Sequence, residues 1–154
     1  MRKGIDRLDR KILRALQDDG RLSNLQLAEH VSLSPTATAE RLKRLTRDGY
    51  ILGYQACLSP EKLDRGMLVY VEVKLDRTTP DVFESFAAAV RRSADVMECH
   101  MVAGGFDYLV KARVQGMETY RAFLSDVILS LPGVRETHTY PVMEEIKNTD
   151  KLPV

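Results

Sequence analysis

Cysteine and histidine are scarce in this chain. Its 154 residues include two cysteines and three histidines. Cys57 and Cys99 lie in apolar, strand-like contexts without the CxxC spacing of a metal or redox pair, which predicts small hydrophobic residues of a core or an interface. His30, His100 and His138 are scattered, with neither metal-site spacing nor a nearby nucleophile pattern. We therefore expect no metal, no cofactor and no enzyme activity.

Long apolar segments are also missing. No run approaches the roughly 18 residues needed to cross a bilayer, and the N-terminal sequence MRKGIDRLDR has no signal-peptide core. The sequence thus predicts a cytoplasmic protein that has no membrane contact.

An excess of one charge is absent overall, since the formal net charge is +1. The two parts of the chain nevertheless differ. Residues 1–58 hold 11 Lys and Arg against 7 Asp and Glu, a net charge of +4. Residues 59–154 hold 12 against 15, a net charge of −3. This division predicts that only the first part approaches a polyanion.

The basic part contains three helical patterns. An amphipathic pattern starts at Ile5 and ends near Asp19-Gly20. The stretch NLQLAEHVSLSPTATAERLKRLTRDG, residues 24–49, then holds two short patterns that meet at a tight turn. In the second of these, Ser34 is a natural N-cap, Pro35 fits the first helical position and Gly49 supplies a stop. Two short helices at a tight turn are typical of a helix-turn-helix DNA-binding domain.

The second helix of this pair is expected to read DNA. Its apolar side is formed by Leu42 and Leu45, and the opposite side carries Thr36, Arg44 and Arg47. Hydroxyl and guanidinium groups on such a helix can reach bases and phosphates in a major groove. The alternative is a solvated basic face on an ordinary three-helix bundle, and the tight turn favours DNA binding. The candidate DNA-contacting residues are Ser34, Thr36, Thr38, Glu40, Arg41, Lys43, Arg44 and Arg47.

The period of the pattern changes after Ser59-Pro60. Strand-like runs cover residues 67–75, 96–102, 106–114 and 134–146, and helical runs begin at Pro80 and pass through Tyr120. The resulting order is β-α-β-β-α-β, the ferredoxin-like plan of a four-stranded antiparallel sheet with two helices on one face. Tyr70, Glu72 and Lys74 give the other face a half-polar character, which favours packing against another subunit.

The predicted fold class is therefore α+β, an N-terminal helix-turn-helix domain followed by a ferredoxin-like domain. We expect residues 1–50 to bind DNA, residues 51–65 to form a linker strand or hinge, and residues 66–154 to form oligomers.

The chain resembles the Lrp/AsnC family of transcription regulators, and within it the leucine- and alanine-responsive members. The segments that carry the resemblance are LDRKILRALQDDGRLSNLQLAEHVSLSP, GYILGYQACLSPEKL, ECHMVAGGFDYLVKARV, LPGVRETHTY and VMEEIK. Their order and spacing together are specific and cover essentially the whole chain. The resemblance implies a winged-helix-like DNA-binding domain, a C-terminal domain of residues 66–154 that binds an amino-acid effector, dimers as the building unit and often octamers.

An amino-acid site is plausible at one turn. Gly104 and Gly105 let backbone N–H groups approach a carboxylate closely, and Asp107 can pair with an ammonium. The alternatives are a simple hairpin turn and a turn-capping acid. The resemblance implies that the effector binds at this turn, at Ala103, Gly104, Gly105, Phe106, Asp107 and Tyr108. It also implies facing positions in the last strand, at Thr137, Thr139, Tyr140, Pro141 and Val142.

The function expected from these observations is a sequence-specific transcription regulator of double-stranded DNA. It responds to an amino acid such as leucine or alanine, and acts as a homodimer that assembles to an octamer. The alternative is a nucleoid-associated protein that coats DNA with little sequence-specific regulation, because Lys and Arg give non-specific affinity by themselves.

Overall fold

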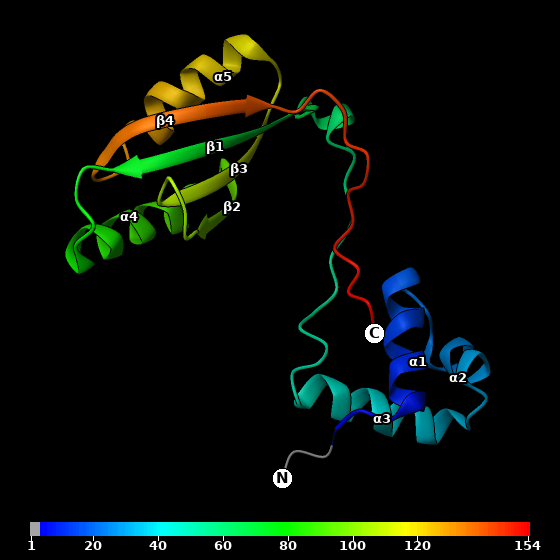
Figure 1. Cartoon of the computed structure of the whole chain (residues 1–154). Helices are drawn as coiled ribbons and strands as arrows, with labels where there is room; N and C mark the ends of the chain where they lie inside the picture. The colour runs from blue at the N-terminus through cyan, green and yellow to red at the C-terminus, as the bar shows by residue number, and fades with distance from the viewer. Residues whose placement is uncertain (1–3) are drawn as a thin grey trace. The chain divides into compact units, whose positions relative to one another are not determined.

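A computed structural model describes residues 4–154 and divides the chain into two compact units (Figure 1). Unit 1 contains residues 1–57 and 148–154, and unit 2 contains residues 58–147. The division after Cys57 falls within the expected hinge. Residues 148–154, which we had expected in the effector domain, group with the helical unit instead.

Unit 1 contains three helices, α1 (Arg7–Asp18), α2 (Asn24–Val31) and α3 (Pro35–Arg47). Each has a side-chain N-cap: the side chains of Asp6, Ser23 and Ser34 accept hydrogen bonds from backbone N–H groups of the first turns. Ser32 adopts a left-handed conformation with φ of 56°, which closes the tight turn between α2 and α3. The expected helix-turn-helix arrangement is confirmed.

The core of unit 1 is small and contains residues from all three helices. Ile12 of α1, Leu27 and Val31 of α2, and Leu45 of α3 are at most 1% exposed. Side chains on the margins of this cluster include that of Val154. Burial of these apolar side chains fixes α2 and α3 against α1.

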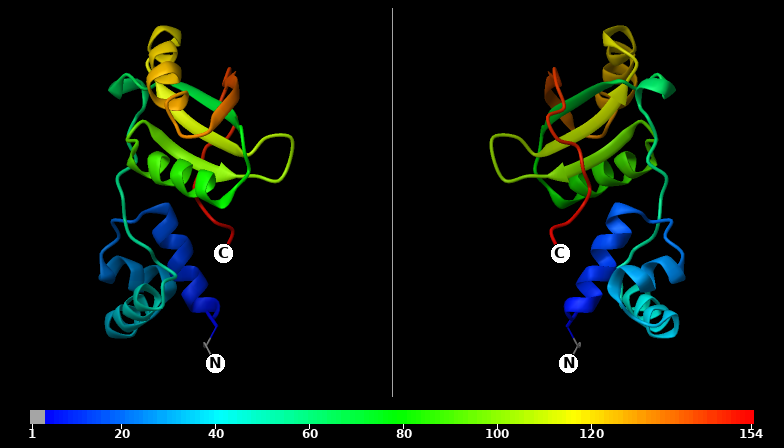
Figure 2. Two further views of the ribbon diagram at one scale, coloured as in Figure 1. Left: turned by 90° about the vertical axis from the view of Figure 1, so that its left-hand side faces the viewer. Right: turned by 90° about the vertical axis from the view of Figure 1, so that its right-hand side faces the viewer.

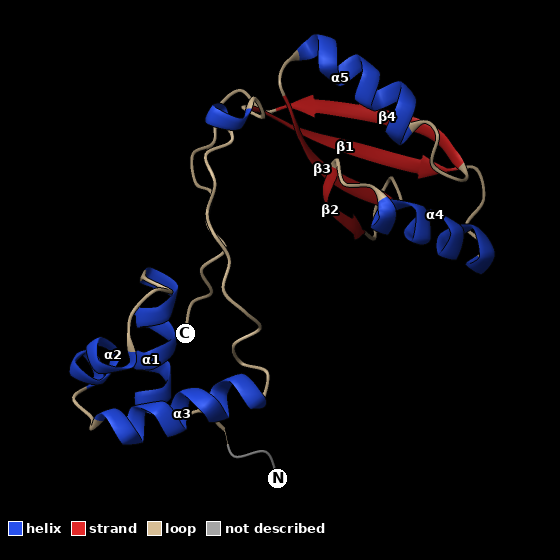
Figure 3. Ribbon diagram, turned by 180° about the vertical axis from the view of Figure 1, so that it is seen from behind, coloured by secondary structure: helices blue, strands red, loops and turns tan. Residues whose placement is uncertain are grey.

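Two stretches of chain connect the units, and Figure 3 draws both without helix or strand. Residues 51–59 form neither helix nor strand, so the expected linker strand does not form, and they precede the short 3-10 helix η1 (Glu61–Leu63). Cys57 is exposed, which contradicts a core position and leaves the interface alternative a prediction, whereas Cys99 is half-buried. Residues 142–154 form the second stretch, and its last residues contact α1.

Unit 2 has the predicted order β-α-β-β-α-β. The strands are β1 (Met67–Leu75), β2 (Val96–Met101), β3 (Tyr108–Val114) and β4 (Val134–Pro141), in the antiparallel spatial order β2-β3-β1-β4. The helices α4 (Pro80–Arg92) and α5 (Met117–Phe123) pack on the sheet, and π-helical turns of η2 (Leu124–Ile128) extend α5 (Figure 2).

The two faces of this sheet differ in character. Val69, Val71 and Val73 of β1 are fully buried and belong to one core cluster with Phe86 of α4 and Tyr120 of α5. The intervening residues of β1 are half-buried and polar, and they lie on the opposite face. β4 ends at Pro141, five residues before the predicted end at Ile146.

Candidate DNA-binding surface and effector site

The exposed side of α3 carries half of the predicted DNA-contacting residues. Thr36, Glu40, Lys43 and Arg47 are all exposed and lie on one side of the helix. Ser34 at the start of the helix is also exposed, and its hydroxyl accepts a hydrogen bond from the N–H of Ala37 at 3.2 Å. A shallow hollow runs beside this side, lined by Asn24, Ala39, Leu42, Lys43, Thr46 and Arg47.

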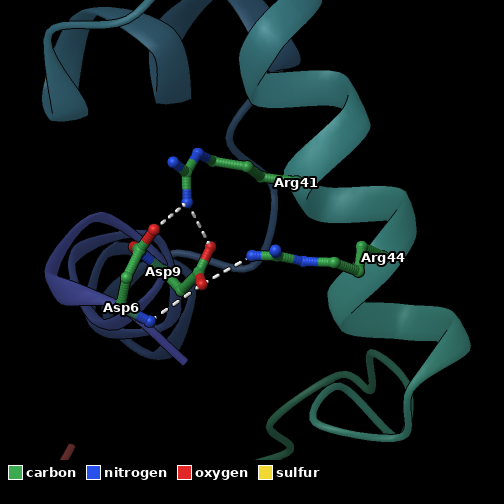
Figure 4. Close-up of polar contacts among 4 residues, drawn as sticks. All are labelled: Asp6, Asp9, Arg41 and Arg44. Atoms are coloured by element: carbon green, nitrogen blue, oxygen red, sulfur yellow. Dashed lines mark hydrogen bonds and ion pairs between the residues drawn. The ribbon is translucent and has the colours of Figure 1, made fainter. Parts of the chain in front are cut away.

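The expected outward orientation of Arg44 is wrong. Its Nη2 atom lies 2.6 Å from Oδ2 of Asp9, a residue of α1 that is fully buried. Arg41 also points toward α1, with Nη1 at 2.8 Å from Asp9 and 2.6 Å from Asp6 (Figure 4). Both guanidinium groups are therefore tied to acidic groups on the inner flank of α3.

The prediction that Thr38 contacts DNA is wrong. Its side chain is fully buried between the helices, and its hydroxyl has no hydrogen-bond partner. A hydroxyl in this position cannot reach a base edge. Helical spacing had already placed Thr38 on the same side as Leu42 and Leu45, so its burial was visible in the sequence.

The Asp6 carboxylate at the start of α1 is strongly stabilised in its charged form. The backbone N–H of Asp9 donates to the Asp6 carboxylate at 2.8 Å. This bond and then the bond from Arg41 lower the pKa of Asp6 from 3.8 to about 2. The Asp6 and Asp9 carboxylates in turn raise the pKa of Arg41. Asp6 and Arg41 are thus both charged at neutral pH.

The predicted effector turn connects β2 to β3 and extends beyond the strands (Figure 2). It is closed by a hydrogen bond from the N–H of Val102 to the carbonyl of Asp107 at 3.0 Å. Gly104 and Gly105 do not need positive φ angles, and a Cβ atom on either would meet nothing within 4 Å. Packing within the chain therefore does not require glycine at these two positions.

Asp107 caps the end of β1. Its Oδ2 atom accepts a hydrogen bond from the N–H of Leu75 at 2.7 Å, and its own N–H donates to Val73 at 3.0 Å. This geometry corresponds to the capping role that we had set against an effector contact. A second role, toward an ammonium, stays a prediction.

Tyr108 belongs to the core, so its expected effector contact is wrong. The side chain is 5% exposed and stacks on Phe86 with ring centroids 4.3 Å apart. Burial raises the pKa of its phenol group. In the neighbouring turn, Ala103 is exposed and Phe106 is half-buried.

The structure separates the predicted residues of the last strand. Thr137 pairs with Val73, the residue that bonds Asp107, and so lies beside the turn. Thr139 pairs with Val71 and shares the helix-covered face, where its hydroxyl bonds Tyr120. The others lie toward the opposite end of β1: Tyr140 pairs with Tyr70, Pro141 pairs with Val69, and Val142 bonds Leu68. At about 3.3 Å per residue, they lie roughly 10–16 Å from the turn within one chain.

A polar hollow of about 160 Å³ lies beside the turn, on the sheet face opposite the helices. Sequence reasoning did not include four of its six lining residues among the candidates. The alternation of Tyr70, Glu72 and Lys74 marked this face as polar. The residues that β4 contributes to the same face follow only from its pairing with β1. The lining residues are Glu72, Lys74, Gly105, Phe106, Glu136 and His138.

Residues 4–154, which the structure describes, contain no group of three or more His, Cys, Asp or Glu side chains placed to hold a metal ion. None of the helices in the same range is long and apolar enough to cross a membrane.

Comparison with known families gives two matches that together cover nearly the whole chain. The model of winged helix-turn-helix DNA-binding domains matches residues 5–51, and the model of the Lrp/AsnC ligand binding domain matches residues 68–152. The chain belongs to the Lrp/AsnC family. Within this family it resembles the leucine-responsive regulatory proteins of Salmonella typhimurium and Escherichia coli K12, with 52% and 51% identity over 152 residues. The match covers 99% of this chain and 93% of each relative.

Solved structures of Lrp/AsnC regulators have the same fold. A transcriptional regulator from Neisseria meningitidis in complex with L-methionine has 39% identity and a TM-score of 0.93. An AsnC family regulator from Agrobacterium tumefaciens has 34% identity and a TM-score of 0.92. Each alignment covers 97% of both chains. This member of the Lrp/AsnC family is thus a DNA-binding transcription regulator with a ligand-binding domain.

Proposed function

We propose that an amino acid binds at the turn of residues 103–107 and the hollow beside it, and thereby changes how the chain binds DNA. The observation that supports this proposal is that the hollow holds both a positive and a negative side chain, and a free amino acid needs one partner of each charge. Lys74 can bind the carboxylate, while Glu72 and Glu136 can bind the ammonium. A volume of about 160 Å³ is that of about five water molecules, which suits a small amino acid.

The glycine pair supports the same site. Because neither backbone conformation nor packing within the chain requires Gly104 or Gly105, their small size is available to something that approaches from outside. The names of similar proteins point to the chemical class. The relatives are called leucine-responsive, and the Neisseria regulator was solved with L-methionine.

The proposed site is tested by a thermal-shift screen of the standard amino acids, followed by calorimetry with the best one. A ligand that binds only the folded state raises the unfolding temperature. Lys74→Met should lower the affinity at least about tenfold, the loss of one charged hydrogen bond. Lys62→Met, a matched change in η1 away from the hollow, should leave it unchanged. Equal affinities in all three proteins would contradict the site.

We further propose that two copies assemble through the polar face of the sheet, and that the dimers associate to octamers in the cytoplasm. The half-buried Tyr70, Glu72 and Lys74 give this face the mixed character of a subunit interface. Sedimentation of the full chain should show a dimer or a larger assembly. A Glu72→Lys substitution, which places like charges on this face, should shift the equilibrium toward monomer.

A further inference from the structure

Asp9 has an unusual environment for a carboxylate of a small helical domain. The residue is 0% exposed, and both of its oxygens are used (Figure 4). Oδ1 accepts from Arg41 at 2.8 Å, and Oδ2 accepts from Arg44 at 2.6 Å and from the N–H of Asp6 at 3.0 Å. A single buried side chain of α1 thus holds two arginines of α3, one helical turn apart.

These bonds limit what the two arginines can do. A buried carboxylate requires opposite charge beside it, so moving Arg41 or Arg44 to a phosphate would leave Asp9 poorly compensated. The cluster of Asp6, Asp9, Arg41 and Arg44 also has no net charge, because two acids face two bases. It therefore attracts a polyanion much less than two free arginines would.

The opposite side of α3 is accessible to DNA. Lys43 and Arg47 are exposed and lie one turn apart, with Thr36 and Glu40 beside them. Arg47 makes an exposed ion pair with Asp48 at 2.9 Å. Exposed pairs of this kind are weak and exchange readily with a phosphate.

We propose that Asp9 is a positioning residue for DNA recognition. It holds Arg41 and Arg44 against α1, so that α3 meets DNA with the side that carries Thr36, Glu40, Lys43 and Arg47. The role rests on the DNA-binding function of the family and concerns which face of the helix performs it. Arg41 and Arg44 consequently set the orientation of α3 and do not read the sequence.

The first experiment compares Asp9→Asn with the wild type in binding two duplexes of equal length. One duplex is selected for binding from a random pool, and the other has random sequence. An asparagine can still accept the bond from Asp6, but it loses the charge that pairs with Arg44 and leaves Arg41 with the Asp6 carboxylate alone. We expect the slope of log affinity against log salt to steepen by about one to two units, at about 0.9 per phosphate contact. The preference for the selected duplex should fall.

A charge-matched control separates positioning from a change in net charge. Asp18→Asn removes one negative charge from the same helix at a position whose side chain is 75% exposed. It should leave both the slope and the preference unchanged. An unchanged slope in Asp9→Asn, or the same steepening in Asp18→Asn, would overturn the proposal.

A second pair of variants keeps the proposal testable if Asp9→Asn does not fold. Arg44→Met should leave the salt slope unchanged, and Lys43→Met should flatten it by about one unit. Both affinities are corrected for the folded fraction, measured by thermal unfolding of the same samples. A flattening in Arg44→Met as large as that in Lys43→Met would show that Arg44 contacts phosphate, and would overturn the proposal.

Discussion

At the scale of single residues, the buried hydroxyl of Thr38 destabilises the helical unit, and no contact in the structure compensates for it. Its oxygen has no partner, and an unsatisfied buried polar group destabilises a fold by about 1–3 kcal/mol. Valine has nearly the same shape and no hydroxyl. Thr38→Val should therefore raise the free energy of unfolding by about 1 kcal/mol, measured by urea denaturation. DNA affinity should not change, and a loss of affinity would show that Thr38 contributes to DNA binding.

Asp6 makes the stability of the helical unit depend on pH. Its pKa in the folded chain is about 2, below the ordinary 3.8, because of bonds from Asp9 and Arg41. A depressed pKa means that the stabilisation is complete above the unfolded pKa and is lost as pH falls through the folded one. The melting temperature of the wild type should exceed that of Asp6→Asn at about pH 5, and the gap should close toward about pH 2. A gap independent of pH would contradict this account.

Residue roles were only partly predictable from the sequence. The N-cap at Ser34 was predicted, because capping is local. The contacts of Asp9 with Arg41 and Arg44 span 32 and 35 positions. Helical spacing placed Arg44 on the side opposite Leu42 and Leu45, but spacing within one helix cannot show that a neighbouring helix holds an acid within reach of a long side chain. Only the position of α1 decides it.

At the scale of elements, Gly133 fixes the passage from η2 to β4. Its φ is +77°, and a Cβ atom there would lie 2.6 Å from Cγ1 of Val82 in α4. Gly133→Ala should lower the free energy of unfolding by at least about 1–2 kcal/mol, from the backbone alone. Gly104→Ala, where a Cβ meets nothing, is the matched control and should change stability little. Equal stability of the two variants in denaturant titrations would refute the stated role of Gly133.

The order of the elements was predictable because the hydrophobic period changes from helix to strand at recognisable breaks. The end of β4 was not. Apolar residues continue to Ile146, but the strand stops at Pro141, which pairs with Val69 near the start of β1. Beyond that point β1 offers almost no partner, and a sequence cannot show where the neighbouring strand begins. The hollow beside the turn was missed for the same reason, since its lining comes from separate strands and a turn.

At the scale of the whole molecule, the chain leaves unit 1 after Cys57 and returns to it at Asn148. The returning segment docks on α1. Gln17 donates to the carbonyl of Leu152 at 3.0 Å and accepts from its N–H at 2.6 Å, and Lys151 lies 2.8 Å from Asp18. The two units are thus joined by two covalent connections, both available to transmit a change from the ligand-binding domain.

The docking of this segment can be measured at one amide. Gln17→Ala removes both side-chain bonds to Leu152, so the Leu152 amide should exchange with solvent hydrogen faster than in the wild type. At about 0.5–1.5 kcal/mol for each of the two bonds, the acceleration should be between about fivefold and about 150-fold. Arg10→Ala, a change elsewhere on the exposed surface of α1, is the control. Equal exchange in Gln17→Ala and the wild type would mean that the segment is not docked.

The central claim is that ligand binding in unit 2 and DNA binding by unit 1 are coupled. Coupling between two sites is reciprocal by thermodynamic necessity. The most direct measurement is therefore the affinity of the best-screened amino acid, by calorimetry, with and without saturating amounts of the selected duplex. The account predicts that DNA changes this affinity by the same factor, about five-fold or more, by which the amino acid changes the affinity for DNA. An amino-acid affinity that is identical with and without DNA would contradict it.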